Sequence, residues 1–339
     1  YEDLTSTNMW AVYGPDATVW NFYVLGNFYP SLFTYSDQRF DWIPSLATDF
    51  PTELTQEGDF WVSEVKMKQG VKWSDGEEIT AEDVAFTANT VLELQLPGGN
   101  WQAVYDWDVL DHVEAVDKYT VKFYFKEKPG LARWQFGAAM GPILPKHYWE
   151  SVVEEAKKAD DPAATLFAHV PEGEPSAGGF MFDKWEKGAY VEISENPNYF
   201  FKGAKVIEYA NGAYKEVLPD GTEFTAYGDP TGDVSLEFTV GPYVPSVIYT
   251  LYGTKDAAVM AMREGEIDFM LDPLGLTKGL QEQLAGVEGI TLIKNPSNGF
   301  RYLAFNCRRA PMDMKAVSYT HLRAHETRHE LVCRLLLEK

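Results

Sequence analysis

The residues most able to do chemistry in this 339-residue chain gather near its C-terminal end. His321, His325, His329 and Cys333 recur every four residues. Two such side chains one helical turn apart can share a Zn²⁺ ion, as in H-E-x-x-H sites. All four cannot, because each four-residue step along a helix advances about 6 Å and rotates about 40°. A two-ligand site stays open as an alternative, but we favour a plain helix or an unstructured tail and expect no metal.

The segment that carries these residues, 317–339, also differs in charge from the rest of the chain. It holds four basic and three acidic residues, whereas the whole chain has a net charge of −22. The segment resembles translated adapter sequence of the kind found at the ends of unrelated chains. We therefore expect it to be non-native and assign it no function.

Other catalytic groups lack the partners that their chemistry needs. Cys307 has no histidine near it in sequence and no glycine run to form an oxyanion hole, so we interpret it as a buried strand cysteine. The chain contains no G-x-S-x-G, P-loop or G-x-G-x-x-G motif. Its 51 carboxylates would place some pair across a cleft by chance. We expect no enzyme and no cofactor, and keep an extracytoplasmic, glycosidase-like hydrolase as the alternative.

Composition narrows the class of protein further. With 29 basic against 51 acidic residues, the surface repels phosphate backbones and anionic lipid, which argues against nucleic-acid and membrane-surface partners and favours a monomer. No stretch approaches about 18 apolar residues, so the sequence predicts no membrane span. The two cysteines cannot form a disulfide framework, and the start at Tyr1 shows no leader sequence. Neither feature indicates the compartment.

Local patterns predict a mixed α/β chain. A strand is expected at 59–68 from its near-alternating apolar residues, and a capping box at Thr80 and Asp83 predicts a helix to about residue 94. The remaining predicted elements are hairpins at 109–126 and 179–195, a hairpin turn at Pro219–Gly221, helices near 131–140 and 146–159, and alternating helices and strands over 255–306. Such alternation predicts at least one partly parallel sheet.

A series of spaced motifs is the most specific signal. In chain order they are N-F-Y-P-S-L at 27–32, P-S-L-A at 44–47, V-K-M-K-Q-G-V-K-W-S-D-G-E-E-I-T-A-E-D-V-A-F at 65–86, Trp185 with Gly188, N-P-N-Y-F at 196–200, G-E-I-D at 265–268, L-A-F-N at 303–306 and A-P-M-D at 310–313. This series resembles the family 5 extracellular solute-binding proteins, the periplasmic dipeptide- and oligopeptide-binding components of ABC transporters. The resemblance covers residues 20–316. It departs at 176–180, which reads S-A-G-G-F where relatives have a G-T-G-P-Y-like stretch.

The resemblance implies an α/β, bilobal fold of the periplasmic-binding-protein kind, of the class with an extra inserted subdomain. Lobe I would comprise 1–45 and 175–270, the inserted subdomain 46–174, and the start of lobe II 275–316. Because family members continue for roughly another domain, we expect the second lobe to be largely missing. The 65–86 block has a structural role in this interpretation, since its residues close a turn and cap a helix.

The resemblance also implies a function. Family members capture peptides in an interlobe cleft and deliver them to membrane permease subunits, so we expect those partners and a periplasmic or cell-surface-anchored location. Asn27 and Tyr29 lie in a stretch that borders the cleft in the family, and Phe300, Tyr302 and Asn306 in a strand that passes between the lobes. We expect these five residues to bind the solute. Oligosaccharides stay open as the solute class, because aromatic side chains suit sugar rings as well as peptides.

Overall fold

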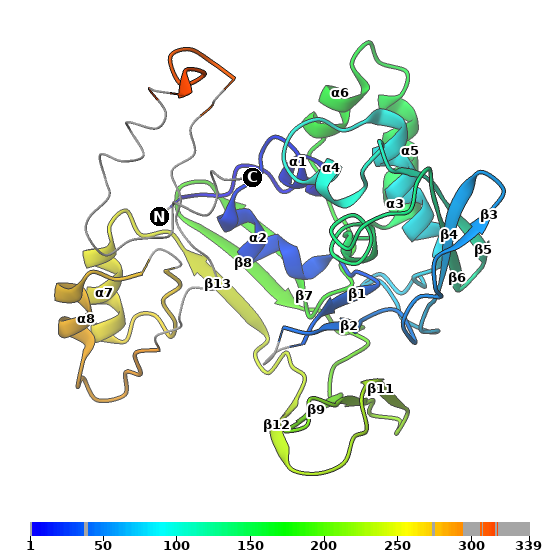
Figure 1. The fold of residues 1–339 in the computed structure, drawn as a ribbon. Coiled ribbons are helices and arrows are strands. Elements are labelled where there is room, and N and C mark those ends of the chain that lie inside the picture. Colours follow the sequence, from blue (N-terminus) through cyan, green and yellow to red (C-terminus); the bar gives the residue numbers. More distant parts are fainter. Residues whose placement is uncertain are drawn as a thin grey trace. The chain divides into compact units, whose positions relative to one another are not determined.

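The computed structural model describes residues 2–36, 40–272, 275–293, 306, 308–315 and 317 (Figure 1). The chain divides into two compact units, Tyr1–Ala258 and Val259–Lys339. Segment 317–339, apart from Val317, lies outside the described residues, as do Cys307, Phe300 and Tyr302.

The first unit contains a four-stranded antiparallel sheet in the order β3-β4-β6-β5. Its strands are β3 (Thr55–Glu57), β4 (Phe60–Lys66), β5 (Leu110–Asp117) and β6 (Thr120–Phe125). The buried side chains of β6 alternate, with Val121, Phe123 and Phe125 fully buried. This period of two gives the sheet one apolar face, against which helix α3 (Ala81–Leu94) packs at β5 and β6.

Helix α3 begins where its sequence signal predicts. The backbone N–H of Thr80 donates to Asp83 Oδ2 at 2.8 Å, which satisfies a backbone donor at the helix start. The other Asp83 oxygen accepts from the N–H of Lys146 at 2.9 Å, at the start of α5 (Lys146–Ala156). A single buried carboxylate therefore connects the first turns of two helices. The other helices of this region are α4 (Trp101–Val104), η2 (Ala138–Met140) and α6 (Pro162–Ala168).

The N-terminal elements pack beside a second sheet, of order β13-β8-β7. They are α1 (Met9–Tyr13), α2 (Val19–Leu25), η1 (Gly26–Phe28) and the β1–β2 ribbon of Phe33–Tyr35 and Trp42–Pro44. The sheet consists of β7 (Phe180–Glu186), β8 (Tyr190–Glu195) and β13 (Ser246–Thr250). Four fully buried tryptophans, Trp10, Trp73, Trp101 and Trp149, belong to the main core. Trp10 and Trp101 lie with ring centroids 5.3 Å apart.

A third sheet, β11-β10-β9-β12, completes the first unit. Its strands are β9 (Lys205–Tyr209), β10 (Tyr214–Val217), β11 (Glu223–Tyr227) and β12 (Val234–Thr239). Lys68, which follows β4, reaches this sheet with only 2% of its side chain exposed and binds Glu216 Oε2 at 2.9 Å. Its ammonium group also lies 4.9 Å from the Phe201 ring centroid and 4.3 Å from that of Phe224. One buried cation thus connects two sheets.

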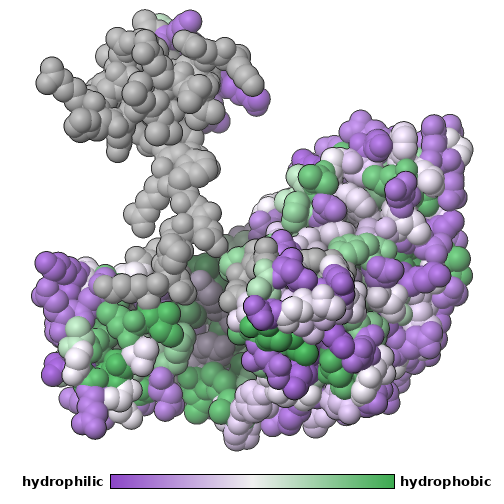
Figure 2. All heavy atoms as spheres, turned by 60° about the horizontal axis from the view of Figure 1, so that its bottom comes forward, coloured by the Kyte–Doolittle hydropathy of each residue, from purple (hydrophilic) through white to green (hydrophobic). Residues whose placement is uncertain are grey.

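The second unit has a small core of its own. Buried Val259, from α7 (Lys255–Glu264), packs with Leu280 and Leu284 of α8 (Lys278–Leu284). Among the described residues of both units, no helix has the length and apolar character to cross a membrane. Hydrophilic side chains, coloured purple, cover much of the face of the first unit that Figure 2 shows. This agrees with the acidic composition of the chain.

Most predicted elements are confirmed, and two predictions are wrong. The strand at 59–68, the helix from Thr80, the three hairpin turns and the helix from 146 are present. Residues 131–140 form turns and one short 3-10 helix instead of an α-helix, because Gly137 adopts a non-helical backbone (φ −113°, ψ −104°). Residues 266–272 form no strand, in contrast to the strand predicted between the two helices of 255–306. Among the described residues, no strand pairs with 266–272 to supply the backbone hydrogen bonds that hold a strand extended. No parallel pair occurs among the described strands, but the second strand predicted in this region falls largely on 294–305, outside the described residues, so the parallel sheet stays a prediction.

Candidate functional site

The candidate site begins with the loop that follows helix α2. Thr18 caps this helix by accepting the N–H of Asn21 at 3.2 Å, and Gly26 ends it. The chain then makes one 3-10 turn through Asn27 and becomes extended at Tyr29 (φ −111°, ψ 120°). Extended backbone is what the following Pro30 favours in the residue before it. Asn27 is exposed and Tyr29 half-buried, so the structure brings these two predicted residues to one short loop.

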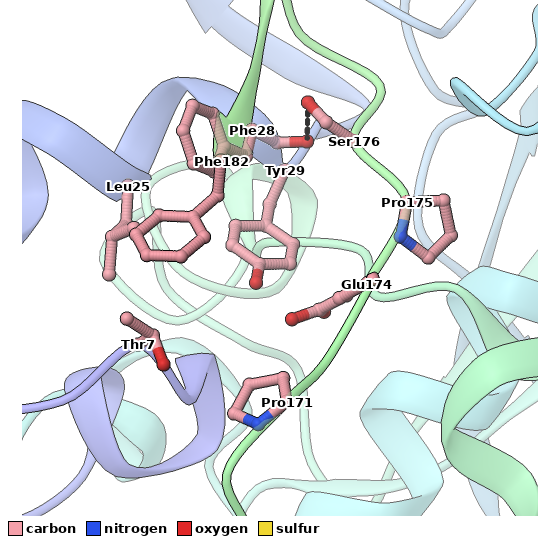
Figure 3. Close-up of a pocket in the computed structure, with 10 residues that line it drawn as sticks. Thr7, Leu25, Phe28, Tyr29, Pro171, Glu174, Pro175, Ser176 and Phe182 are labelled. Carbon is pink, nitrogen blue, oxygen red and sulfur yellow. Dashed lines mark hydrogen bonds between the residues drawn. The ribbon is translucent and has the colours of Figure 1, made fainter. Parts of the chain in front are cut away.

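The ring of Tyr29 lines a small pocket shown in Figure 3. The hydroxyl of Tyr29 points toward the carboxyl group of Glu174, and apolar side chains surround the two. The lining residues are Thr7, Leu25, Phe28, Tyr29, Pro171, Gly173, Glu174, Pro175, Ser176 and Phe182. They come from the N-terminal segment, α2, η1, the 171–176 loop and β7.

Burial sets the electrostatics of this pocket. Glu174 Oε1 accepts the indole N–H of Trp149 at 2.6 Å, and the carboxyl group also interacts with the Tyr29 hydroxyl. These bonds favour the ionised carboxylate, but burial outweighs them and raises the pKa of Glu174 to about 8. Burial, and then the charge of Glu174, raise the pKa of Tyr29 well above its ordinary value. Burial therefore favours the neutral form of both groups.

The pocket is small. About 30 Å³ of it is accessible to the centres of water molecules, which is room for two or three waters at roughly 10–15 Å³ each. Besides Glu174, the polar side chains of its lining are the hydroxyl groups of Thr7, Tyr29 and Ser176, and no basic side chain lines it in the part of the chain that the structure describes. Tyr29 therefore anchors the loop from its buried side, and Asn27 lies on the exposed side of the same loop.

Of the three other predicted site residues, Asn306 lies within the described part of the chain. Asn306 is exposed in the second unit, and its Oδ1 accepts the N–H of Arg308 at 3.1 Å. Phe300 and Tyr302 lie outside the described residues, so their assignment to the solute site stays a prediction. Sequence reasoning missed Glu174, because a single glutamate among 51 acidic residues carries no signal of its own.

Within the described ranges, no three His, Cys, Asp or Glu side chains are grouped so that they could hold a metal ion. His321, His325, His329 and Cys333 lie beyond those ranges.

Comparison with known proteins identifies the family. Residues 41–317 match the model of the bacterial extracellular solute-binding proteins, family 5. The chain belongs to this family. Its members are solute-binding transport proteins that act outside the cytoplasm.

Two relatives illustrate the likeness. The oligopeptide-binding protein AppA of Bacillus subtilis is 31% identical over 191 residues, which cover 56% of this chain and 32% of the relative. Its structure in complex with a nonapeptide superposes with a TM-score of 0.50 at 25% identity, over 72% of this chain and 38% of that one. The periplasmic binding protein DppA of Helicobacter pylori, in complex with the peptide STSA, shares the fold with a TM-score of 0.53 at 20% identity, covering 83% and 46%.

This family 5 chain spans about a third of the length of the curated relatives it matches. The match confirms the α/β, periplasmic-binding-protein-like fold that the spaced motifs predict. The structure shows that residues of the 65–86 block close a turn and cap a helix. Asp75 and Gly76 close a turn, with Gly76 at φ 97°, and Asp83 caps α3.

Proposed function

We propose that this chain belongs to the extracytoplasmic solute-binding subunit of an ABC importer, which captures peptides and delivers them to a membrane permease. The observation that carries the proposal is the likeness to the Bacillus subtilis oligopeptide-binding protein, in sequence and in the structure with a nonapeptide. The family match over residues 41–317 supports the same conclusion. A glycosidase-like hydrolase is not favoured by these relatives.

The proposal assigns the solute to the exposed side of the Asn27–Tyr29 loop. An extended peptide binds largely through backbone hydrogen bonds, which the exposed amide of Asn27 can supply. Tyr29 and Glu174 have a supporting role, because their polar groups face each other inside the pocket. The division into lobe I (1–45 and 175–270), inserted subdomain (46–174) and lobe II (from 275) is part of this proposal.

The partners follow from the same assignment. Delivery of a captured peptide requires membrane permease subunits as partners. It also requires a periplasmic or cell-surface-anchored location for the binding protein. A net charge of −22 favours a monomer in solution, since copies of the chain repel one another. No catalytic step is proposed: the solute is bound and released unchanged.

Titration calorimetry with a mixture of random-sequence nonapeptides tests the function. Because this chain spans about a third of its relatives, the protein used is the full product of the gene that encodes it. We expect saturable binding with one peptide per protein and no change of the peptides by mass spectrometry. Binding of an oligosaccharide mixture but of no peptide would overturn the solute class. Appearance of hydrolysis products would overturn the transport role.

Substitutions in the loop test the site. We expect Asn27→Ala to weaken peptide binding about tenfold, which corresponds to about 1.4 kcal/mol, or one good hydrogen bond. Tyr29→Ala should weaken binding by a similar factor, because the loop that carries Asn27 loses its buried anchor. Asn27 is exposed, so its substitution should leave the melting temperature unchanged. Gln56→Ala, at an exposed position of β3, is the control and should leave binding unchanged. Normal binding by both loop variants would show that the site lies elsewhere.

A further inference from the structure

A buried serine connects segments that lie far apart in the sequence. Ser176 is 2% exposed, and its backbone C=O accepts the N–H of Ser74 at 2.7 Å. In return the Ser176 N–H donates to Ser74 Oγ at 3.0 Å. Fully buried Asn196 donates from its side-chain amide to the C=O of Gly178 at 2.8 Å. Segment 176–178 is thus held on two sides, by the W-S-D-G turn and by the N-P-N-Y-F stretch.

The same segment bonds the loop of the candidate site. The N–H of Ala177 donates to the C=O of Phe28 at 2.8 Å. Ser176 Oγ lies 3.3 Å from the same oxygen, as the dashed line in Figure 3 marks, and 2.7 Å from the C=O of Phe180. A hydroxyl group has one proton, so Ser176 shares it between these two carbonyls. The backbone on either side of Asn27 and Tyr29 is therefore fixed from segment 176–178.

Gly178 approaches the loop more closely than any other residue type could. A Cβ atom built at this position would lie 1.7 Å from the C=O oxygen of Asn27, whereas real Cβ atoms essentially never come within 3.0 Å of a heavy atom. The clash is with backbone, which cannot rotate away as a side chain can. Glycine is needed here for space, and a larger residue would displace Asn27.

Gly179 offers a matched comparison. A Cβ atom at this neighbouring position would lie 3.4 Å from Pro242 Cδ and 3.7 Å from the Tyr199 ring, which are ordinary contacts. Alanine is therefore sterically acceptable at 179 and not at 178. The two adjacent glycines thus differ in whether a Cβ atom would meet the loop.

We propose that Gly178 and Ser176 are positioning residues of the solute site. They fix the positions of Asn27 and Tyr29, and neither Gly178 nor Ser176 contacts the solute itself. The effect that we expect on solute binding rests on the proposed function. The close approach at 178 and the shared hydroxyl at 176 act on the same stretch of backbone. These two contacts also give a role to the S-A-G-G-F segment, whose sequence departs from the one usual in the family.

The first experiment needs no solute. Hydrogen–deuterium exchange is followed on peptides that cover residues 26–30 in the wild-type chain and in the Gly178→Ala, Ser176→Ala and Gly179→Ala variants. We expect exchange of this loop to accelerate at least tenfold in Gly178→Ala and at least threefold in Ser176→Ala, and to be unchanged in Gly179→Ala. Ser176→Ala removes only one oxygen atom, so it reports on the loop even if Gly178→Ala fails to fold. Unchanged exchange in Ser176→Ala, or equal acceleration in both glycine variants, would overturn the proposal.

The second experiment measures affinity for the nonapeptide mixture with the full gene product. We expect Ser176→Ala to weaken binding at least fivefold in the wild-type background and less than twofold in the Asn27→Ala background, because the serine acts through the loop. A purely structural role would give the same factor in both backgrounds and would overturn the positioning role. Absence of binding by the wild-type protein would contradict the proposed function instead, and the exchange experiment would still decide whether the loop is held as described.

Discussion

Ionisation of Glu174 should destabilise the folded chain as pH rises toward 8. The pKa of this carboxyl group is about 8 in the folded state, because burial outweighs its bonds with Trp149 and Tyr29, and it returns to an ordinary value near 4.5 on unfolding. Between these two values the folded state keeps a proton that the unfolded state has lost. Stability therefore falls with rising pH across this window, and the full contribution is present only below about 4.5.

The magnitude follows from the two pKa values. At about 1.36 kcal/mol per pH unit, a rise from 4.5 to about 8 corresponds to at most about 5 kcal/mol. Glu174 is half-buried and water can approach the mouth of the pocket, so we expect a loss on the order of 3 kcal/mol between pH 5 and pH 8. The groups that face it are Tyr29, Tyr148 and Trp149, and none of them is a cation that could offset the charge.

Urea unfolding of the wild-type chain and of Glu174→Gln at half-unit steps from pH 5 to pH 8.5 measures this loss. Glutamine keeps an oxygen for the indole N–H of Trp149 and has no charge to gain. The difference in unfolding free energy between the two proteins should grow in favour of the variant by about 3 kcal/mol as pH rises. Groups that titrate in both proteins cancel in this difference. Parallel pH profiles would refute the assignment of a buried neutral carboxyl group.

Two further predictions concern buried charged groups in the first unit. Asp83→Ala should lower the free energy of unfolding by about 3 kcal/mol in urea titrations, because it leaves the N–H groups of Thr80 and Lys146 unpaired, and a loss under about 1 kcal/mol would contradict this. Glu216→Gln should lower it by about 3 kcal/mol, because it removes the negative charge that offsets the ammonium group of Lys68 in a site that is 2% exposed. The double variant Lys68→Met with Glu216→Leu should regain most of that loss in the same titration, and equal losses in the two variants would argue against the buried pair.

The family and most local elements could be predicted from the sequence. The helix from Thr80 and the hairpin turns depend on residues within a few positions of one another. Short stretches of sequence are therefore enough to predict them. The spaced motifs predicted the family, which the match over 41–317 confirms. Residues 131–140 were mispredicted because helical periodicity there gives no information on how Gly137 is packed.

What only the tertiary structure decided is how those motifs meet. Ser74 and Ser176 exchange two hydrogen bonds across about a hundred residues of chain, and Gly178 contacts the backbone of Asn27 across a still longer stretch. No pattern in the sequence predicts that these residues contact one another, because the contacts depend on the packing of whole sheets and helices. The raised pKa of Glu174 has the same origin. In the unfolded chain this carboxyl group has an ordinary pKa, and only its burial in the folded protein raises that pKa.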